Sequence, residues 1–260
     1  SGPDAADGGG AAAATAAVVF KEKPWNSGQI LWCRQKFKAS LNGLVFNTVV
    51  ANMLNNTATL VEAATSGVGN GRSVYQNLRL ECAAPSDYSI LTNALKDDSV
   101  RDFYYYGHCN GSAIGFSEFV PDNGVTVKDL TKLLRNEVII NKATKRVLFS
   151  FRKPFRFVFI DGCNSASGWL PEAFGIFAIP NFTGNFKNRA YLGWKTTTKN
   201  SIANNSYLKF SQKFWEAWLD ETEAYNRSIV DARDIAVGQA PGVNIQNLQI
   251  FGFNGLTWRE

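Results

Sequence analysis

Short runs of apolar residues, separated by polar and glycine-containing turns, recur along this chain. The two clearest are FYYY, which ends at Gly107, and FVFI at 157–160. Continuous apolar runs of this length predict strands that are buried on both faces, as in a parallel sheet. Further strands, rich in β-branched and aromatic residues, are predicted at 29–32, 44–53, 189–194 and 245–253.

Apolar residues at helical spacing predict five helices between and after these strands. Capping residues introduce the first two, because Ser86 is a good N-cap and Thr126 with Asp129 resembles a capping box. The other three are predicted at 170–174, 207–219 and 225–238. Gly238 is expected to stop the last of them.

The order of these elements predicts an α/β fold. The strand that delivers His108, a helix and the strand that delivers Cys163 follow one another, which favours a parallel pair joined by a right-handed crossover. The carboxyl ends of parallel strands meet at one edge of a sheet, where open α/β folds place their chemistry. We therefore expect His108, the only histidine, and Cys163 to lie close together.

Composition narrows the classes of function. The chain has 260 residues, of which 45% are hydrophobic, and its net charge of +5 comes from scattered rather than clustered cations. Nucleic-acid binding is therefore not expected, and the absence of an apolar run of membrane-spanning length argues against a membrane span. Four cysteines without a C-x-x-C pair, and a single histidine, predict neither a zinc site nor any other cofactor.

The low-complexity sequence at the start of the chain suggests where the folded domain begins. Residues 1–17 are expected to be a flexible linker or cloning remnant, and 18–260 one domain. The chain begins at Ser1 without methionine, so we expect a piece of a longer protein with additional domains, whose compartment (cytoplasmic or exported) stays open. The glycine-rich segment 66–73 lacks the lysine of a phosphate-binding loop and is predicted to be a surface loop.

A cysteine and a histidine at neighbouring strand ends can form a nucleophile and its base. The attacking species is the thiolate, which a nearby imidazole stabilises before it protonates the leaving group. Glycine-containing turns at 107–111 and 161–163 can supply backbone N–H groups for an oxyanion. The alternative is structural: a buried cysteine is often inert, and a lone histidine is often a hydrogen-bonded spectator.

The sequence YYGHC ending at Cys109, followed by IDGCNS around Cys163, resembles the clan CD cysteine peptidases: caspases, metacaspases, legumains, gingipains and the separase (CHAT-domain) group. The resemblance implies a caspase-hemoglobinase three-layer sandwich, with about six mainly parallel strands and helices on both faces. It implies His108 as base, Cys163 as nucleophile, and the N–H groups of Cys109 and Cys163 as the oxyanion hole. A peptide or protein would be the substrate, and a bacterial multidomain protein the source.

The sequence departs from the family at one position. The residue after the family's histidine is usually glycine, whereas here it is Cys109, whose side chain could crowd the oxyanion hole. If this impairs catalysis, the chain is a non-catalytic caspase-like interaction module. If Cys109 and Cys163 are neighbours, they could instead form a regulatory disulfide.

Two residues are candidates for substrate binding. In metacaspases an aspartate at the position of Asp161 pairs with a basic P1 residue, so the resemblance implies cleavage after Arg or Lys; the alternative is that Asp161 caps its own turn. Trp194 lies at the end of a predicted strand that resembles the substrate-binding strand of the family; the alternative is that it is a core residue.

The basic connection 142–156 is expected to be exposed and is a candidate processing site. A third reading is a thiol transferase or hydrolase that acts on a non-peptide acyl group.

Overall fold

The computed structural model describes residues 27–35, 48–53, 55–56, 59, 74–82, 88–115, 124–176, 188–198, 205–220, 222–223 and 226–258. The predicted linker at 1–17, the glycine-rich segment 66–73 and the N-cap Ser86 lie outside the described residues. No helix within these ranges is long and apolar enough to cross a membrane.

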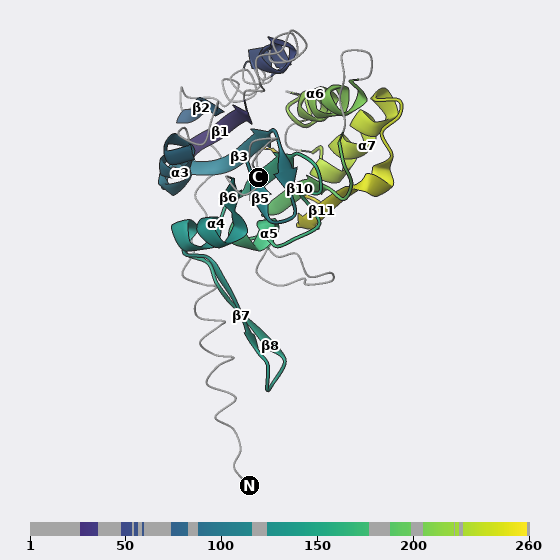
Figure 1. The fold of residues 1–260 in the computed structure, drawn as a ribbon. Coiled ribbons are helices and arrows are strands. Elements are labelled where there is room, and N and C mark those ends of the chain that lie inside the picture. The colour runs from purple at the N-terminus through teal and green to yellow at the C-terminus, as the bar shows by residue number, and fades with distance from the viewer. Residues whose placement is uncertain are drawn as a thin grey trace.

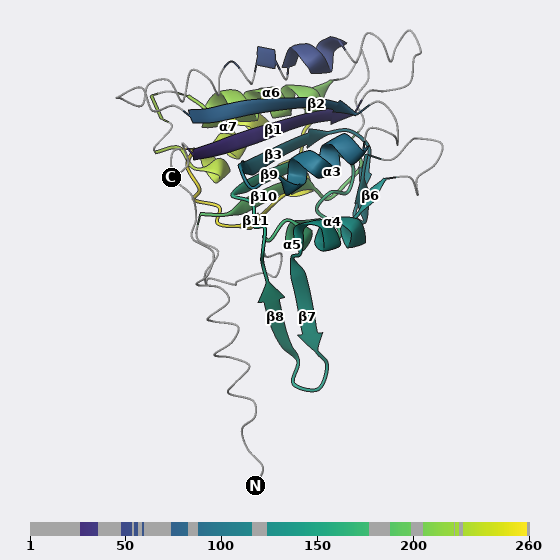
Figure 2. The same ribbon diagram turned by 90° about the vertical axis from the view of Figure 1, so that its left-hand side faces the viewer.

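A six-stranded sheet forms the centre of the fold (Figures 1 and 2). Neighbouring strands are parallel except for the last pair, which is antiparallel. The predicted α/β class with mainly parallel strands is therefore confirmed. In spatial order the strands are β2 (Val74–Cys82), β1 (Ser27–Gln35), β3 (Val100–Tyr106), β9 (Phe157–Asp161), β10 (Ala190–Trp194) and β11 (Leu248–Gly252).

One face of the sheet is covered by α6 (Ser206–Trp218) and α7 (Ile229–Gln239) (Figure 1). Alternate strand residues point to this face, because side chains in a strand have a period of two. The core here is largely aromatic, and ring pairs in edge or tilted contact add about 0.5–1.5 kcal/mol each beyond their buried area. Its fully buried rings include Trp32, Tyr104, Phe157, Phe159, Phe214, Trp215, Trp218 and Trp258.

The opposite face is covered by α3 (Tyr88–Lys96), α4 (Val127–Leu134) and α5 (Leu170–Ala173). The predicted capping box of α4 is present: the Thr126 side chain accepts from Asp129 N at 3.0 Å, and Asp129 Oδ2 accepts from Thr126 N at 3.2 Å. Helices on both faces, as predicted, explain why the central strands are apolar throughout rather than alternating.

Two small sheets lie between β3 and β9 in the chain. One consists of β4 (Cys109–Asn110), β5 (Ala113–Ile114) and β6 (Val125–Thr126). The other is a hairpin of β7 (Glu137–Asn141) and β8 (Arg146–Ser150), which projects from the body (Figure 2). The sequence predicts only a basic, polar connection over part of this hairpin, at 142–156.

The predicted strand 44–53 is wrong where the structure describes it, because residues 48–53 are helical. The valines there favour a strand locally, but Val50 and Met53, three positions apart, both pack into the aromatic core beside α6. Tertiary packing therefore overrides the propensity of β-branched residues.

The boundaries predicted for the helix 225–238 are also wrong. It begins at Ile229, where the Ser228 side chain accepts a hydrogen bond from Asp231 N at 3.2 Å. Gly238 lies inside the helix, which ends at Gln239 shortly before Pro241, a residue that cannot continue it. The predicted final strand is shorter too, because 245–247 form a 3₁₀ turn before β11.

A buried ion pair ties the beginning of β3 to the residue just before β9. Asp102 accepts from Arg156 Nε at 3.1 Å and Nη2 at 3.2 Å, and from Phe157 N at 3.0 Å. Arg156 also donates to the carbonyl of Trp258 at 2.8 Å and lies over its ring. Arg156 is 2% exposed, so the expectation that 142–156 is exposed throughout is wrong at its end.

Candidate functional site at two strand ends

His108 lies just beyond the carboxyl end of β3, next to the point where the strand order reverses. The chain leaves β1 toward one edge of the sheet and β3 toward the other, and ligands in open α/β folds bind at this switch. The backbone of His108 is held firmly: its N–H donates to Gln35 Oε1 at 2.7 Å. Its carbonyl accepts from Gly115 N at 2.9 Å and from the Tyr105 hydroxyl at 3.0 Å.

Cys163 occupies the matching position on the neighbouring strand. The register of β3 and β9 pairs Tyr106 with Asp161, the last residue of each strand. His108 and Cys163 each follow two residues later, so they occupy equivalent positions past the ends of neighbouring parallel strands, at the same edge of the sheet. Cys163 is partly exposed, as a nucleophile must be.

The two turns that carry these residues are in direct contact. A Cβ atom added to Gly162 would lie 2.5 Å from the carbonyl oxygen of Gly107 and 2.6 Å from Cys109 Cβ. Further along, a Cβ atom on Gly168 would collide with the carbonyl oxygen of Gly111. Glycine at both contact points lets the backbones approach closely, which fixes the turn of Cys163 against the turn of His108.

The backbone nitrogen of Cys109 lies close to the turn of Cys163, and its N–H is not used in the pairing with β5. The bond from Gly115 N to His108 O marks these two residues as a hydrogen-bonded antiparallel pair, so the next pair, Cys109 and Ile114, is not hydrogen-bonded. The N–H of Cys109 therefore points away from β5, and its nitrogen is 3.4 Å from where a Cβ of Gly162 would be. This orientation suits an oxyanion donor.

The Cys109 side chain lies in the core rather than at the site surface. It is 3% exposed and packs with residues on the α4 side of the sheet. Burial, and then the neighbouring Cys163, raise the pKa of the Cys109 thiol well above its ordinary value. Both cysteines are free thiols in the structure, which therefore shows no disulfide between them.

The segment after β10 contacts the Cys163 sulfur. Thr198 N donates to Cys163 Sγ at 3.2 Å, and the Thr198 hydroxyl lies 3.6 Å from the same atom. Closer to β10, Asn164 N donates to Thr196 O at 3.0 Å and Ala166 N to Trp194 O at 2.9 Å. Residues 194–198 therefore run along the turn of Cys163, and an N–H group lies beside the sulfur.

Asp161 is buried beneath the site, on the α6 face. Its carboxylate accepts hydrogen bonds from Tyr104 Oη at 2.6 Å, from Trp194 Nε1 at 2.8 Å and from Ser211 Oγ. Burial raises the pKa of Asp161 to about 6, although these three donors oppose the shift. The carboxylate therefore lies among neutral donors, and a substrate cation reaches it only by displacing one of them.

Trp194 is a core residue in this structure. It is fully buried and packs against Tyr207 and Phe210 with ring centroids 5.0 and 5.2 Å apart. Its backbone N–H donates to Ser165 Oγ at 2.9 Å, and its position in β10 pairs with Leu248 of β11. These bonds leave little of its backbone for pairing with an added peptide strand.

Three residues that hold the site were missed in the sequence: Gln35, Ser165 and Thr198. Gln35 ends β1 and is 7% exposed, yet only the strand order shows that it lies beside His108. Ser165 is fully buried and joins the Cys163 turn to β10, and its carbonyl also accepts from Tyr191 Oη at 2.7 Å. The one signal in the sequence that could have identified Gln35 is its position as a polar residue at the end of an apolar run.

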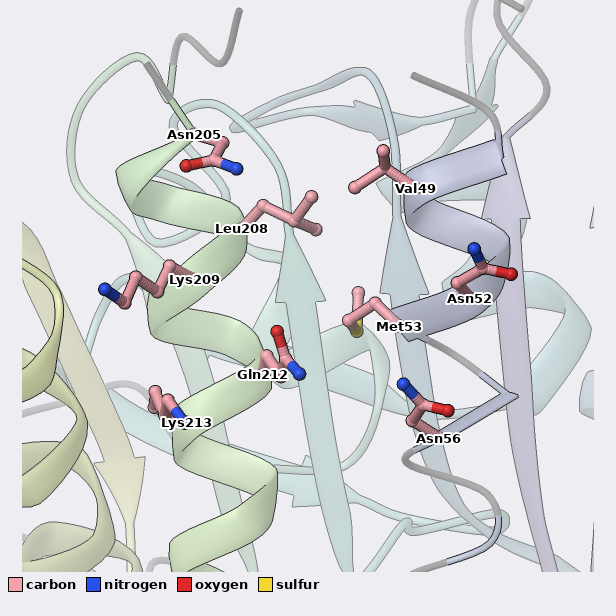
Figure 3. Close-up of a pocket in the computed structure, with 9 residues that line it drawn as sticks. All are labelled: Val49, Asn52, Met53, Asn56, Asn205, Leu208, Lys209, Gln212 and Lys213. Atoms are coloured by element: carbon pink, nitrogen blue, oxygen red, sulfur yellow. The ribbon is translucent and has the colours of Figure 1, made fainter. Parts of the chain in front are cut away.

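Three surface hollows lie away from the two turns. The one in Figure 3, about 440 Å³, separates α6 from the helical residues 48–53, with Leu208, Gln212 and Met53 pointing toward one another. None of the three includes His108 or Cys163 among its lining residues. Within the described ranges, no three His, Cys, Asp or Glu side chains gather in a way that could hold a metal ion.

The chain was compared with known proteins. No protein-family model matches it, and no curated protein sequence is significantly similar. The basis for assigning a function is therefore the geometry of the two strand ends.

Proposed function

We propose that this protein is a cysteine endopeptidase with the caspase-hemoglobinase architecture, in which His108 and Cys163 form the catalytic dyad. The observation that carries the proposal is the register of β3 and β9, which brings both residues to equivalent positions two residues past paired strand ends. The parallel sheet with one antiparallel edge strand and helices on both faces is consistent with that architecture.

In the proposed reaction, His108 accepts the thiol proton and Cys163 Sγ attacks the carbonyl carbon of the scissile peptide. The C–S bond forms as the carbonyl π electrons move onto oxygen, and the N–H groups of Cys109 and Cys163 stabilise this oxyanion. Collapse breaks the C–N bond, and His108 protonates the leaving amine. Water, deprotonated by His108, then hydrolyses the thioester and restores the free thiol.

For specificity, we propose a basic P1 residue recognised by Asp161. The support is a buried carboxylate whose three described partners are all neutral, which a guanidinium or ammonium group would stabilise. Recognition requires a P1 cation to replace one donor. Ser211 is the simplest to displace, because its hydroxyl also lies 3.1 Å from the carbonyl oxygen of Tyr207 and can donate there instead.

The second candidate is a non-catalytic interaction module of the same fold. The observation that favours it is the contact of Thr198 with the Cys163 sulfur, since the strand end that should receive substrate is covered by the chain itself. In this alternative, Cys163 is a structural thiol that holds 194–198 in place.

The decisive experiment is hydrolysis of fluorogenic peptides that differ at P1, with wild type, Cys163→Ala and His108→Ala in parallel. Cleavage after Arg or Lys that disappears in both variants supports the dyad and the specificity together. Cleavage after another residue retains the dyad and rejects the role of Asp161. No turnover, with Cys163 no more reactive toward iodoacetamide than a free thiol, rejects the peptidase and favours the interaction module.

A further inference from the structure

Four cations surround a hollow of about 490 Å³ where α4 meets the base of the β7–β8 hairpin. They come from three places in the chain: the body of α4, the residue that ends it, and the residues after β8. The complete lining is Lys128, Thr131, Lys132, Arg135, Glu137, Ser150 and Arg152. The hollow thus holds four positive side chains and one carboxylate, with two hydroxyl groups between them.

The four positive side chains of this hollow are not paired with other described residues of the protein. Among the described residues, none of its four cationic side chains forms an ion pair or hydrogen bond, whereas other cations such as Arg156 and Arg227 do. All four are exposed. Repulsion between like charges that are held close together destabilises the folded state unless a counter-charge is present. A bound anion would relieve this repulsion.

Helix electrostatics do not account for the cluster. Lys128 lies in the first turn of α4, where the helix dipole favours negative rather than positive side chains. Lys132 follows four positions later on the same face, and like charges at this spacing destabilise a helix. Lys132 and Arg135 suit the end of the helix, but Lys128 and Arg152 have no such role.

The backbone of Arg135 supplies an independent observation. It ends α4 in the left-handed conformation, with φ 55° and ψ 28°, where glycine is the residue that fits without strain. Arginine at this position costs stability, and no described contact of its guanidinium offsets that cost. A requirement for the side chain itself, at the rim of the hollow, explains why a strained arginine stands there.

We propose that this hollow binds a small polyphosphate, meaning a ligand with two or more linked phosphate groups. Its volume lies within the range of small-molecule sites, about 300–1,000 Å³. Arginine matches phosphate oxygens with paired N–H donors, lysine adds point charge, and the hydroxyls of Thr131 and Ser150 supply neutral donors. The site is separate from the strand ends of His108 and Cys163, and does not depend on the proposed peptidase activity.

The test is isothermal titration of the whole chain with inorganic tripolyphosphate, comparing wild type with Arg135→Gly. We expect saturable 1:1 binding by wild type and at least tenfold weaker binding by Arg135→Gly, whose melting temperature should equal or exceed that of wild type because glycine relieves the strain. Lys128→Ala/Lys132→Ala should also weaken binding at least tenfold. The matched control, Lys142→Ala/Lys145→Ala, removes two exposed lysines from the turn of the hairpin and should bind within twofold of wild type.

Two further titrations identify the source of the phosphates. Tighter binding of ATP than of tripolyphosphate supports a nucleotide, and binding to vesicles of phosphatidylcholine with a phosphoinositide supports a lipid headgroup. Absence of saturable tripolyphosphate binding overturns the proposal. Equal weakening by the hairpin-turn control also overturns it, because the effect would then be one of diffuse charge.

Discussion

The indole nitrogen of Trp194 donates a hydrogen bond of 2.8 Å to the carboxylate of Asp161. Both residues were expected to contact substrate, and the structure joins them to each other inside the core. Ser211 of α6 and Tyr104 of β3 complete the set of donors, so the carboxylate connects β3, β9, β10 and α6. This network lies directly under the turn that carries Cys163 and gives that turn a fixed base.

The first prediction concerns the pH dependence of stability. The folded-state pKa of Asp161 is about 6, above its ordinary value of 3.8, because the group is buried. Its carboxyl is therefore most favourable to folding below about pH 4, and that contribution is lost as the pH rises through 6. The loss is on the order of 3 kcal/mol. Asp161→Asn removes it, so the variant should gain stability relative to wild type from pH 4 to pH 7.

Urea unfolding of both proteins at several pH values in this window measures the effect. Asp220→Asn is the matched control: the hydrogen bond from the Thr222 hydroxyl lowers the pKa of Asp220 below its ordinary value of 3.8, so its contribution is lost only as the pH falls toward that value, and its difference from wild type should stay constant between pH 5 and 7. A difference for Asp161→Asn that is equally flat would mean that the carboxyl titrates normally.

The second prediction concerns the buried pair of Arg156 and Asp102. Arg156→Met leaves the Asp102 carboxylate buried without its cation, which typically costs 3–5 kcal/mol, and we expect a loss of about that size in the free energy of unfolding. Lys213→Met breaks the partly exposed pair with Glu216 and should cost less than about 1 kcal/mol. Similar losses for the two variants in urea unfolding would contradict the structural role assigned to Arg156.

How far the sequence predicts this fold depends on where each element gains its stability. The strands β3 and β9 are apolar throughout because both faces are covered, so their pattern is strong. The crossover rule then brings the strand ends that carry His108 and Cys163 to the same edge of the sheet. Residues 48–53 became a helix because of distant aromatic partners. In the β7–β8 hairpin, Ile139 and Ile140 are exposed, so the order of apolar and polar residues there does not follow burial and gives no clear strand signal.

The environment of the two strand ends is harder to predict than their place at one edge of the sheet. The position of Asp161 in the sequence matches a family motif and predicts a pocket residue, but the direction of its side chain depends on strand parity. It shares the face of Phe157 and Phe159, which is the face covered by α6. Which residues of α6 meet that face is decided by packing, so the contact with Ser211 could not be read from the sequence.

The third prediction tests the close contact of the two turns. Gly162→Ala places a methyl group 2.5 Å from the Gly107 carbonyl oxygen and must push the turns of His108 and Cys163 apart. We expect loss of stability and at least a tenfold loss of any peptidase activity, because catalytic geometry tolerates little displacement. Gly238→Ala is the control: Gly238 lies in α7, where an added Cβ would meet no atom within 4 Å beyond its own stretch of helix, and the substitution should stabilise the fold by about 0.5–1 kcal/mol. Wild-type stability and activity in Gly162→Ala would show that the turns can separate freely.

The fourth prediction concerns the reactivity of the thiols. Cys163 is partly exposed, whereas Cys33 and Cys109 are buried, and burial keeps the Cys109 thiol protonated. Brief treatment of the native protein with iodoacetamide should therefore modify Cys163 before Cys33 and Cys109, which should react only after unfolding in urea. Peptide mass mapping locates the label, and Cys163→Ser should remain unmodified at Cys33 and Cys109 under native conditions.

Thr198→Pro removes the N–H that donates to the sulfur. If the segment 194–198 shields the thiol, this variant should be alkylated faster; if the N–H stabilises a thiolate, it should be alkylated more slowly. The direction of the change distinguishes a covered structural thiol from a nucleophile held ready by its backbone donor.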